Sequence, residues 1–210
     1  MNILVSCICT PNYAEYARKV LEAFDKNITN PEGHNIKYEV RSYNAFPEYD
    51  KFAFMNDWHK GTKISLWRFS IYQDCEYDRI ILLDADMTIE GNLDLLISEK
   101  LNDKPFYACK DYGCPHYYKD RIPEYLKGKL FNGGLQIINK PLLKDGFLKD
   151  LVIGESFDGS DQGYLLNYFY NKGIEIGYLP DEYNYAFQDS YYSKLDKCII
   201  RHWTGRKPWE

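Results

Sequence analysis

Apolar runs alternate with amphipathic patterns along most of the chain. Residues 3–9 are almost entirely apolar, which predicts a strand, and residues 13–24 carry apolar side chains at helical spacing, which predicts a helix. Residues 79–83 consist of Arg79 and four consecutive apolar residues, a run that is typical of a strand buried on both faces. The same criteria predict strands at 36–41, 106–109, 135–139, 174–179 and 198–201, and helices at 65–73, from Pro141 onward and at 161–170.

This alternation predicts an α/β fold in which a parallel sheet is flanked by helices. The chain has no internal repeat and no linker rich in glycine, proline or serine, so residues 1–210 are expected to form a single domain. Sheets of this kind bind ligands in the crevice beyond the carboxyl ends of their strands. Residues that follow the predicted strands are therefore the first candidates for function.

Composition narrows the functions that such a fold could serve. The 210 residues include 26 lysines and arginines against 31 aspartates and glutamates, a net charge of −5. This acidic balance argues against nucleic acid as a partner, because affinity for phosphate backbones comes mainly from many basic contacts. A small phosphorylated ligand is compatible with it, provided that a metal ion or a local basic patch supplies positive charge.

No feature of the sequence predicts a membrane span or export. No stretch approaches the roughly 20 apolar residues of a membrane span. The apolar start has neither the basic flank nor the cleavage site of a signal peptide. We therefore expect a cytoplasmic protein whose six cysteines are reduced.

Two aspartates follow directly on the apolar run at 79–83. Asp84 and Asp86 are two positions apart, so on an extended segment their carboxylates point to the same side. Two like charges held so close are unfavourable unless a cation lies between them or one is protonated. A divalent metal is the simplest occupant, and an imidazole ligand would favour Mn²⁺ over Mg²⁺. The alternative is that these are turn acids that cap a helix near Asn92.

A second family shares this local pattern. The string from Asp84 to Thr88 also fits the D-x-D-x-T motif of haloacid-dehalogenase-like phosphatases, in which the first aspartate is the nucleophile. That motif usually lies on the family's first strand, whereas at least two predicted strands precede it here. The later acidic pair in G-D-x-x-x-D form is also missing. A phosphatase that uses Asp84 and Asp86 is therefore the second hypothesis.

Three later segments add groups that could complete a ligand site. Residues 131–139 place Asn132 and two glycines before a strand, where the amide can bind ligand hydroxyls and glycine allows close backbone approach. Asp161 and Gln162 stand at a predicted helix start. His202 follows an apolar run and precedes a glycine, an arginine and a lysine that could clamp a diphosphate. The alternatives are a tight turn, a helix cap and a structural histidine.

Taken in order, the motifs D-x-D, F-N-x-G, G-x-D-Q-G and H-x-x-G-x-K-P-W resemble one enzyme family. From Thr10 to Trp209 the chain resembles glycosyltransferases of the GT-A fold, specifically the glycogenin-like and bacterial galactosyltransferase-like family. Within it, the chain most resembles the N-terminal domain of a larger chlorella-virus glycosyltransferase. The resemblance implies a viral protein of the host cytoplasm, a longer full chain with additional domains, and a GT-A (Rossmann-like) α/β/α sandwich with a mostly parallel central sheet.

The resemblance also implies a reaction. It implies a Mn²⁺-dependent enzyme, with Mg²⁺ as the alternative, in which Asp84, Asp86 and His202 hold the metal. The enzyme would move a sugar from a nucleotide-diphosphate donor, a UDP-hexose or related UDP-sugar, to a hydroxyl of a glycan or glycoprotein acceptor. Retention at the anomeric carbon is implied, while an inverting enzyme with Asp111 or Asp161 as base is the alternative. A module that binds nucleotide sugars without catalysis is a further hypothesis.

The family pattern assigns roles to further positions. Gln162, Asp161 and Asp111 match positions beside the reacting sugar, with Gln162 facing the anomeric carbon. Residues 114–129 match no family segment, and we expect them to determine acceptor specificity. The tail is one residue shorter between Gly205 and Lys207 than in glycogenin. The positions that match nucleotide- or donor-binding residues are Thr10, Tyr16, Lys63, Arg68, Asp84, Ala85, Asn132, Gly133, Gly205 and Lys207.

Overall fold

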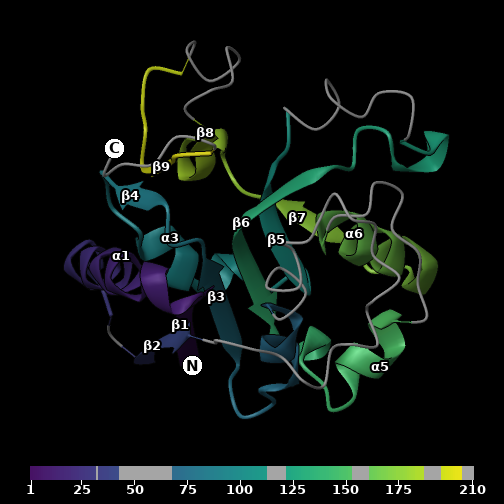
Figure 1. The fold of residues 1–210 in the computed structure, drawn as a ribbon, viewed down its shortest axis with the longest axis horizontal. Helices are drawn as coiled ribbons and strands as arrows, with labels where there is room; N and C mark the ends of the chain where they lie inside the picture. Colours follow the sequence, from purple (N-terminus) through teal and green to yellow (C-terminus); the bar gives the residue numbers. More distant parts are fainter. Residues whose placement is uncertain (32, 43–67, 113–121, 153–160, 187–194, 205–210) are drawn as a thin grey trace.

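A twisted sheet of six strands forms the centre of the protein (Figure 1). The computed structural model describes residues 1–31, 33–42, 68–112, 122–152, 161–186 and 195–204. The strand order in the sheet is β2-β1-β3-β6-β5-β7. These strands are β1 (Asn2–Cys9), β2 (Asn35–Ser42), β3 (Arg79–Leu83), β5 (Phe106–Lys110), β6 (Phe131–Asn139) and β7 (Ile176–Tyr178).

One strand, β6, runs against the other five. It pairs antiparallel with β3 and with β5, whereas β1 pairs parallel with β2 and β3, and β5 pairs parallel with β7. The predicted mostly parallel sheet is thus confirmed. Because β6 is reversed, its first residues lie where β3 ends: Leu83 pairs with Leu135, and the N–H of Asp84 donates to the carbonyl of Gly134 at 2.9 Å.

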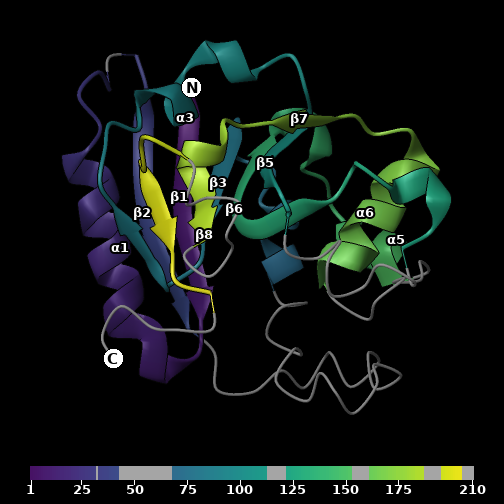
Figure 2. The same cartoon turned by 90° about the horizontal axis from the view of Figure 1, so that it is seen from above.

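Helices cover both faces of the sheet, as Figures 1 and 2 show. Side chains alternate along β1, so Ile3 and Val5 join the core under α1 and α3, while Leu4 and Ile8 join the core under α5 and α6. The α-helices are α1 (Ala14–Lys26), α3 (Asp94–Ile97), α5 (Phe147–Val152) and α6 (Asp161–Lys172). Short 3-10 helices span Pro11–Tyr13, Arg68–Gln73, Glu99–Leu101, Glu124–Leu126, Lys140–Leu142 and Asp181–Asn184.

A second, three-stranded sheet lies beyond the end of β3. It consists of β4 (Met87–Ile89), β8 (Tyr185–Ala186) and β9 (Ile200–His202), with β9 in the centre. In the antiparallel pairing of β4 with β9, Met87 lies opposite His202. This pairing brings the C-terminal part of the chain next to Asp86, although 116 positions separate it from His202 in the sequence.

Two predicted helices and one predicted strand need correction. The strand expected at 135–139 starts earlier, at Phe131, so Asn132 and the two glycines predicted to precede it lie within it. The helix expected at 65–73 is a 3-10 helix over Arg68–Gln73, and its first three residues lie outside the described part of the chain. The helix expected from Pro141 is only the 3-10 turn Lys140–Leu142, because Leu143 is already extended, and α5 starts at Phe147. No helix within the described residues is long and apolar enough to cross a membrane.

Candidate active site at the end of strand β3

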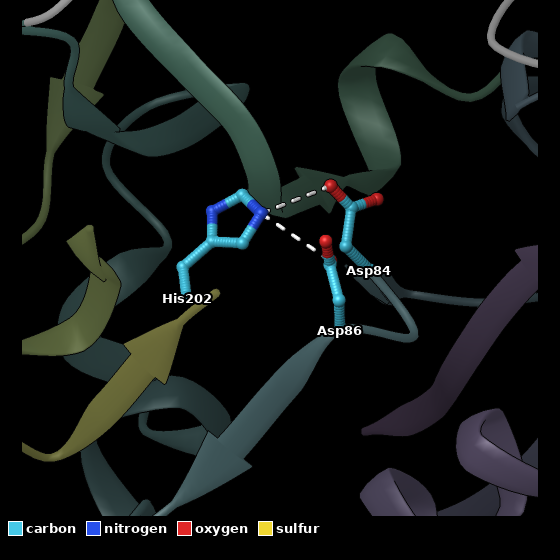
Figure 3. Close-up of side chains that lie close together, drawn as sticks. All are labelled: Asp84, Asp86 and His202. Atoms are coloured by element: carbon cyan, nitrogen blue, oxygen red, sulfur yellow. Dashed lines mark ion pairs between the residues drawn. The ribbon is translucent and has the colours of Figure 1, made fainter. Parts of the chain in front are cut away.

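Asp84, Asp86 and His202 point toward one another just beyond the end of β3 (Figure 3). Nε2 of His202 lies 3.5 Å from Oδ2 of Asp84 and 3.4 Å from Oδ1 of Asp86. The two carboxylates, predicted to lie on an extended segment, lie on the turn between β3 and β4. His202, predicted to follow a strand, is the last residue of β9. The turn and the pairing of β9 with β4 make the three groups converge.

The three side chains fit a divalent metal ion. Each offers one ligand atom, and these atoms all lie within 4.8 Å of one another. Around an octahedral ion with bonds of about 2.1 Å, neighbouring ligand atoms are about 3.0 Å apart and opposite ones about 4.2 Å. The distances of 3.4 and 3.5 Å fall inside that range, so small side-chain rotations suffice. Two carboxylates and one imidazole suit Mn²⁺, and Mg²⁺, a chemically harder cation, is the alternative.

Gly134 provides the space that the His202 ring occupies. A Cβ at Gly134 would lie 2.4 Å from Cε1 and 2.6 Å from Nδ1 of His202, and 2.8 Å from Cε of Met87. The backbone of Gly134 is not in the left-handed region, so space rather than conformation requires glycine here. The imidazole therefore packs directly on the backbone of β6.

Opposing charges surround Asp84. Burial raises the pKa of the Asp84 carboxyl, and the nearby Asp86 carboxylate adds to this, although the Arg68 guanidinium and His202 act in the other direction. Nη1 of Arg68 lies 2.9 Å from Oδ1 of Asp84. A carboxylate whose charge is disfavoured in this way gains more from a bound cation than an exposed one does.

Arg68 connects Asp84 to the residues expected near the donor sugar. Its side chain is only 10% exposed, lies 3.8 Å from Oδ2 of Asp161 and donates to the carbonyl of Gly133. The N–H of Gly133 donates to Oε1 of Gln162. Burial works against the charge of Arg68, but Asp84 and Asp161 outweigh it and raise the pKa of Arg68. The structure thus brings Arg68, Gly133, Asp161 and Gln162 together beside Asp84.

Two of the residues expected to bind the nucleotide line one surface groove. Tyr16 of α1 and Ala85 lie along a groove of about 400 Å³ that Met87 and Thr88 also line. Thr10 directly follows β1, which pairs parallel with β3 with Cys7 opposite Leu83. Thr10 therefore stands at the same edge of the sheet as Asp84, as the strand-end rule predicts.

The remaining predicted residues either follow a strand that is not adjacent to β3 or lie outside the described part of the chain. Asp111 follows β5, two strands from β3 in the sheet order, and its N–H donates to the carbonyl of Leu130 at 3.2 Å. It lies at the same edge of the sheet as Asp84. Lys63, Gly205 and Lys207 fall outside the described residues.

One residue of the site was not predicted from the sequence. Asn184, the last residue of the 3-10 helix Asp181–Asn184, is fully buried behind His202. Its Oδ1 lies 2.9 Å from Nδ1 of His202, and its Nδ2 donates to Oδ1 of Asn132 at 2.8 Å. Asparagine is common in turns, and nothing in its sequence neighbourhood distinguishes it from an ordinary turn residue.

Two curated relatives align with almost the whole chain. Glycosyltransferase GlyA of Streptococcus pneumoniae is 25% identical over 214 residues, which cover 95% of this chain and 27% of that protein. UDP-glucuronate:xylan alpha-glucuronosyltransferase 1 of Arabidopsis thaliana is 27% identical over 214 residues, which cover 94% of this chain and 26% of that protein. The chain spans about a quarter of the length of these two relatives.

Two solved structures share the fold. The galactosyltransferase LgtC, crystallised with donor and acceptor sugar analogs, has a TM-score of 0.64 at 19% identity, over 100% of this chain and 90% of that one. A glycosyltransferase involved in the glycosylation of the major capsid of PBCV-1 has a TM-score of 0.57 at 15% identity, over 99% and 95% of the two chains. These likenesses confirm the predicted GT-A type of α/β fold.

The match to a family model covers more of the chain than any single motif does. It runs over residues 3–210 and so includes β1, the Asp84–Asp86 turn, the start of β6 and the His202 tail. Neither the phosphatase hypothesis nor the hypothesis of a module without catalysis is favoured by this match. The predicted resemblance is confirmed, and the chain belongs to glycosyl transferase family 8.

Proposed function

We propose that this protein is an enzyme that transfers a sugar, a hexose or a related one, from a UDP-sugar to a hydroxyl of a glycan or glycoprotein. The observation that carries the proposal is the convergence of Asp84, Asp86 and His202 at the ligand-binding edge of the sheet, beside Arg68. Family membership supports the reaction class. The name of the Arabidopsis relative gives a UDP-sugar, UDP-glucuronate, as that protein's donor, which supports uridine here.

Asp84, Asp86 and His202 would hold Mn²⁺, or Mg²⁺ in its place, against the donor diphosphate. When bound, the ion supplies Lewis acidity that stabilises negative charge on the departing phosphate. The chain's own contribution is orientation: Arg68 fixes Asp84, and the carbonyl of Asp86 accepts from the N–H of Trp203 at 3.0 Å, which anchors the tail that carries His202. Gly205 and Lys207 remain the proposed diphosphate clamp.

We propose that the anomeric configuration is retained. The bond from the anomeric carbon to the diphosphate would break as the acceptor oxygen bonds to the same face, with the acceptor proton passing to the leaving phosphate. Gln162 supports this route, because an amide is a weak nucleophile and its Oε1 already accepts from Gly133. Asp161 is engaged by Arg68 at 3.8 Å. Asp111 is proposed to lie beside the reacting sugar.

The acceptor is proposed to bind along residues 114–129. Within the described part of this segment, Tyr125 is 44% exposed, and the centroid of its ring lies 4.3 Å from that of Tyr170, which is 46% exposed. Exposed aromatic rings can stack on the apolar faces of sugars. Tyr170 is near the C-terminal end of α6, whereas Asp161 at its start faces Arg68, so this pair would contact a part of a glycan acceptor remote from the reacting hydroxyl.

Calorimetric titration with UDP, with and without Mn²⁺, tests the proposal through a matched pair of variants. Asp86→Ala should lose the Mn²⁺-dependent part of UDP affinity. Asp78→Ala should keep it, because Asp78 lies at the opposite end of β3, where its carboxylate accepts from the N–H of Asn2 at 2.7 Å. Unchanged affinity in Asp86→Ala would refute the metal assignment.

A thermal-shift screen of nucleotide sugars then identifies the donor, since a ligand at 100 times its Kd stabilises the fold by about 2.7 kcal/mol. NMR of the fresh product decides the stereochemistry, and an inverted anomer would exclude retention. Release of phosphate from simple esters would instead support the phosphatase hypothesis.

A further inference from the structure

A line of hydrogen bonds leads from the backbone of β6 to the rear of the His202 ring. The N–H of Gly134 donates to Oδ1 of Asn132 at 2.9 Å, and Nδ2 of Asn184 donates to the same oxygen at 2.8 Å. Oδ1 of Asn184 then lies 2.9 Å from Nδ1 of His202. Asn184 is fully buried and His202 is 5% exposed, so water does not compete for these groups.

The first member of this line fixes the direction of all the others. A backbone N–H can only donate, so the Asn132 atom that faces Gly134 must be the carbonyl oxygen. Asn184 must therefore present its NH₂ group to that oxygen and its own carbonyl oxygen to His202. A carbonyl oxygen cannot donate, so the hydrogen of this last bond must be on Nδ1 of His202.

The other nitrogen of the ring faces the carboxylates. Nε2 lies 3.4 Å from Asp86 and 3.5 Å from Asp84. Without a partner for Nδ1, these two acceptors would favour a neutral ring with its hydrogen on Nε2, and that nitrogen could then not ligate a metal. With Nδ1–H engaged by Asn184, Nε2 carries a lone pair and points it between the carboxylates.

We propose that Asn184 is a positioning residue that selects the Nδ1–H form of His202 and so prepares Nε2 as a metal ligand. The inference rests on the metal site of the proposed function. Ligating histidines usually donate their second N–H to an acceptor that fixes the tautomer and the ring orientation, and loss of such a partner costs 10- to 100-fold in metal affinity. The Asn132 side chain and the backbone of Gly134 hold Asn184 in turn, so β6 sets the orientation of the ring on β9.

Two variants at the same position separate positioning from packing. Asn184→Asp keeps an oxygen that can accept from Nδ1–H but loses the donor to Asn132. Asn184→Leu has similar volume and no acceptor. Asn184→Asp should therefore keep Mn²⁺ affinity within a few-fold of wild type, while Asn184→Leu should bind Mn²⁺ 10- to 100-fold more weakly. A purely structural role predicts that the buried charge of Asn184→Asp does at least as much harm as Asn184→Leu.

The tautomer itself is measured without metal, first in the wild-type protein and then in Asn184→Leu. Long-range ¹H–¹⁵N correlation spectra of the wild-type protein at alkaline pH should show a protonated Nδ1 and an unprotonated Nε2 for His202. A His202→Gln variant assigns the signals, because the chain has four histidines. In Asn184→Leu the proton should move to Nε2.

Two kinds of failure are distinguishable. A protonated Nε2 in the wild type, or wild-type Mn²⁺ affinity in folded Asn184→Leu, would overturn the positioning role and leave the proposed metal site intact. A wild-type protein that binds neither Mn²⁺ nor Mg²⁺ would overturn the proposed metal site, and the positioning role with it, whatever the spectra show.

Discussion

A methyl group added at Gly134 should displace His202 and destroy the proposed metal site while the fold survives. In Gly134→Ala the new Cβ would lie 2.4 Å from Cε1 of His202, whereas non-bonded carbon atoms normally lie about 3.5–4.0 Å apart. The ring must retreat by about 1 Å. Metal–ligand distances tolerate only about 0.2 Å, so Nε2 would be lost as a ligand. We expect Mn²⁺ affinity to fall at least 10-fold and stability to fall by about 1–3 kcal/mol from overpacking.

Isothermal titration with Mn²⁺, together with urea unfolding, measures both effects. Gly91→Ala is the matched control, because its Cβ would also meet a side chain closely, at 3.3 Å from Cγ1 of Ile199, but not His202. Neither glycine has a positive φ, so both substitutions test space alone. Gly91→Ala should bind Mn²⁺ like the wild type.

The neighbouring glycine should give a different result. A Cβ at Gly133 would lie 3.1 Å from Oε1 and 3.2 Å from Cγ of Gln162 rather than near the imidazole. Gly133→Ala should therefore keep Mn²⁺ affinity and lose turnover. Wild-type Mn²⁺ affinity in folded Gly134→Ala would refute the claim that this glycine makes the space for the His202 ring as a proposed metal ligand.

Three further predictions concern groups around the site and in the fold. Arg68→Lys keeps the positive charge but loses the planar guanidinium group that contacts Asp84 and the Gly133 carbonyl at the same time. The kcat should therefore fall at least 10-fold while the Tm stays nearly unchanged. An unchanged kcat would contradict this prediction. Arg79 is fully buried and donates to Asn139, Asn102 and three backbone carbonyls. Arg79→Met should therefore lower the free energy of unfolding, measured in urea, by about 3 kcal/mol or more. A loss below about 1 kcal/mol would contradict this prediction. Burial acts to raise the pKa of Asp94, but hydrogen bonds from Thr29, Asn92 and Asn30 outweigh it and lower this pKa to about 2. Because that value lies below the unfolded one, the stabilisation is present above about pH 4 and is lost as the pH falls toward 2. Asp94→Asn should thus unfold about 1 kcal/mol more easily at neutral pH, after allowance for solvent screening, and no more easily near pH 2; a pH-independent difference would refute the assignment.

The central strands could be predicted because their burial leaves a continuous apolar signal in the sequence. Residues 79–83 were predicted as a doubly buried strand, and all five are buried in β3. The rule that ligands bind beyond strand ends then pointed to Asp84 and Asp86, and the structure places both there beside His202. The sequence predicts a strand best where the apolar pattern of the segment matches its burial in the folded protein.

The features that the sequence could not predict depend on pairing between distant segments. β4 and β8 have three and two residues, too few for any periodicity to appear, and they exist because β9 lies between them. The reversal of β6 leaves no local mark either, since a strand buried on both faces is equally apolar in either direction. Asn184 acquires its place only when the segment before β8 folds against the start of β6.

The reversed strand explains how one short segment can organise both halves of the site. Two of the first residues of β6 contact the groups around the proposed metal ligands. Asn132 accepts a hydrogen bond from Asn184, and Gly134 accepts from the N–H of Asp84 and packs against the His202 ring. Gly133 contacts the residues expected near the donor sugar, because its carbonyl accepts from Arg68 and its N–H donates to Gln162. A parallel strand would bring its carboxyl end to this edge and leave its first residues at the far one. The distance between the proposed metal ligands and the residues proposed to face the sugar is therefore set by three consecutive backbone positions. A shift of this whole backbone segment must disturb metal binding and sugar transfer together, whereas a side chain added at one position, as in Gly133→Ala, can disturb one of them alone.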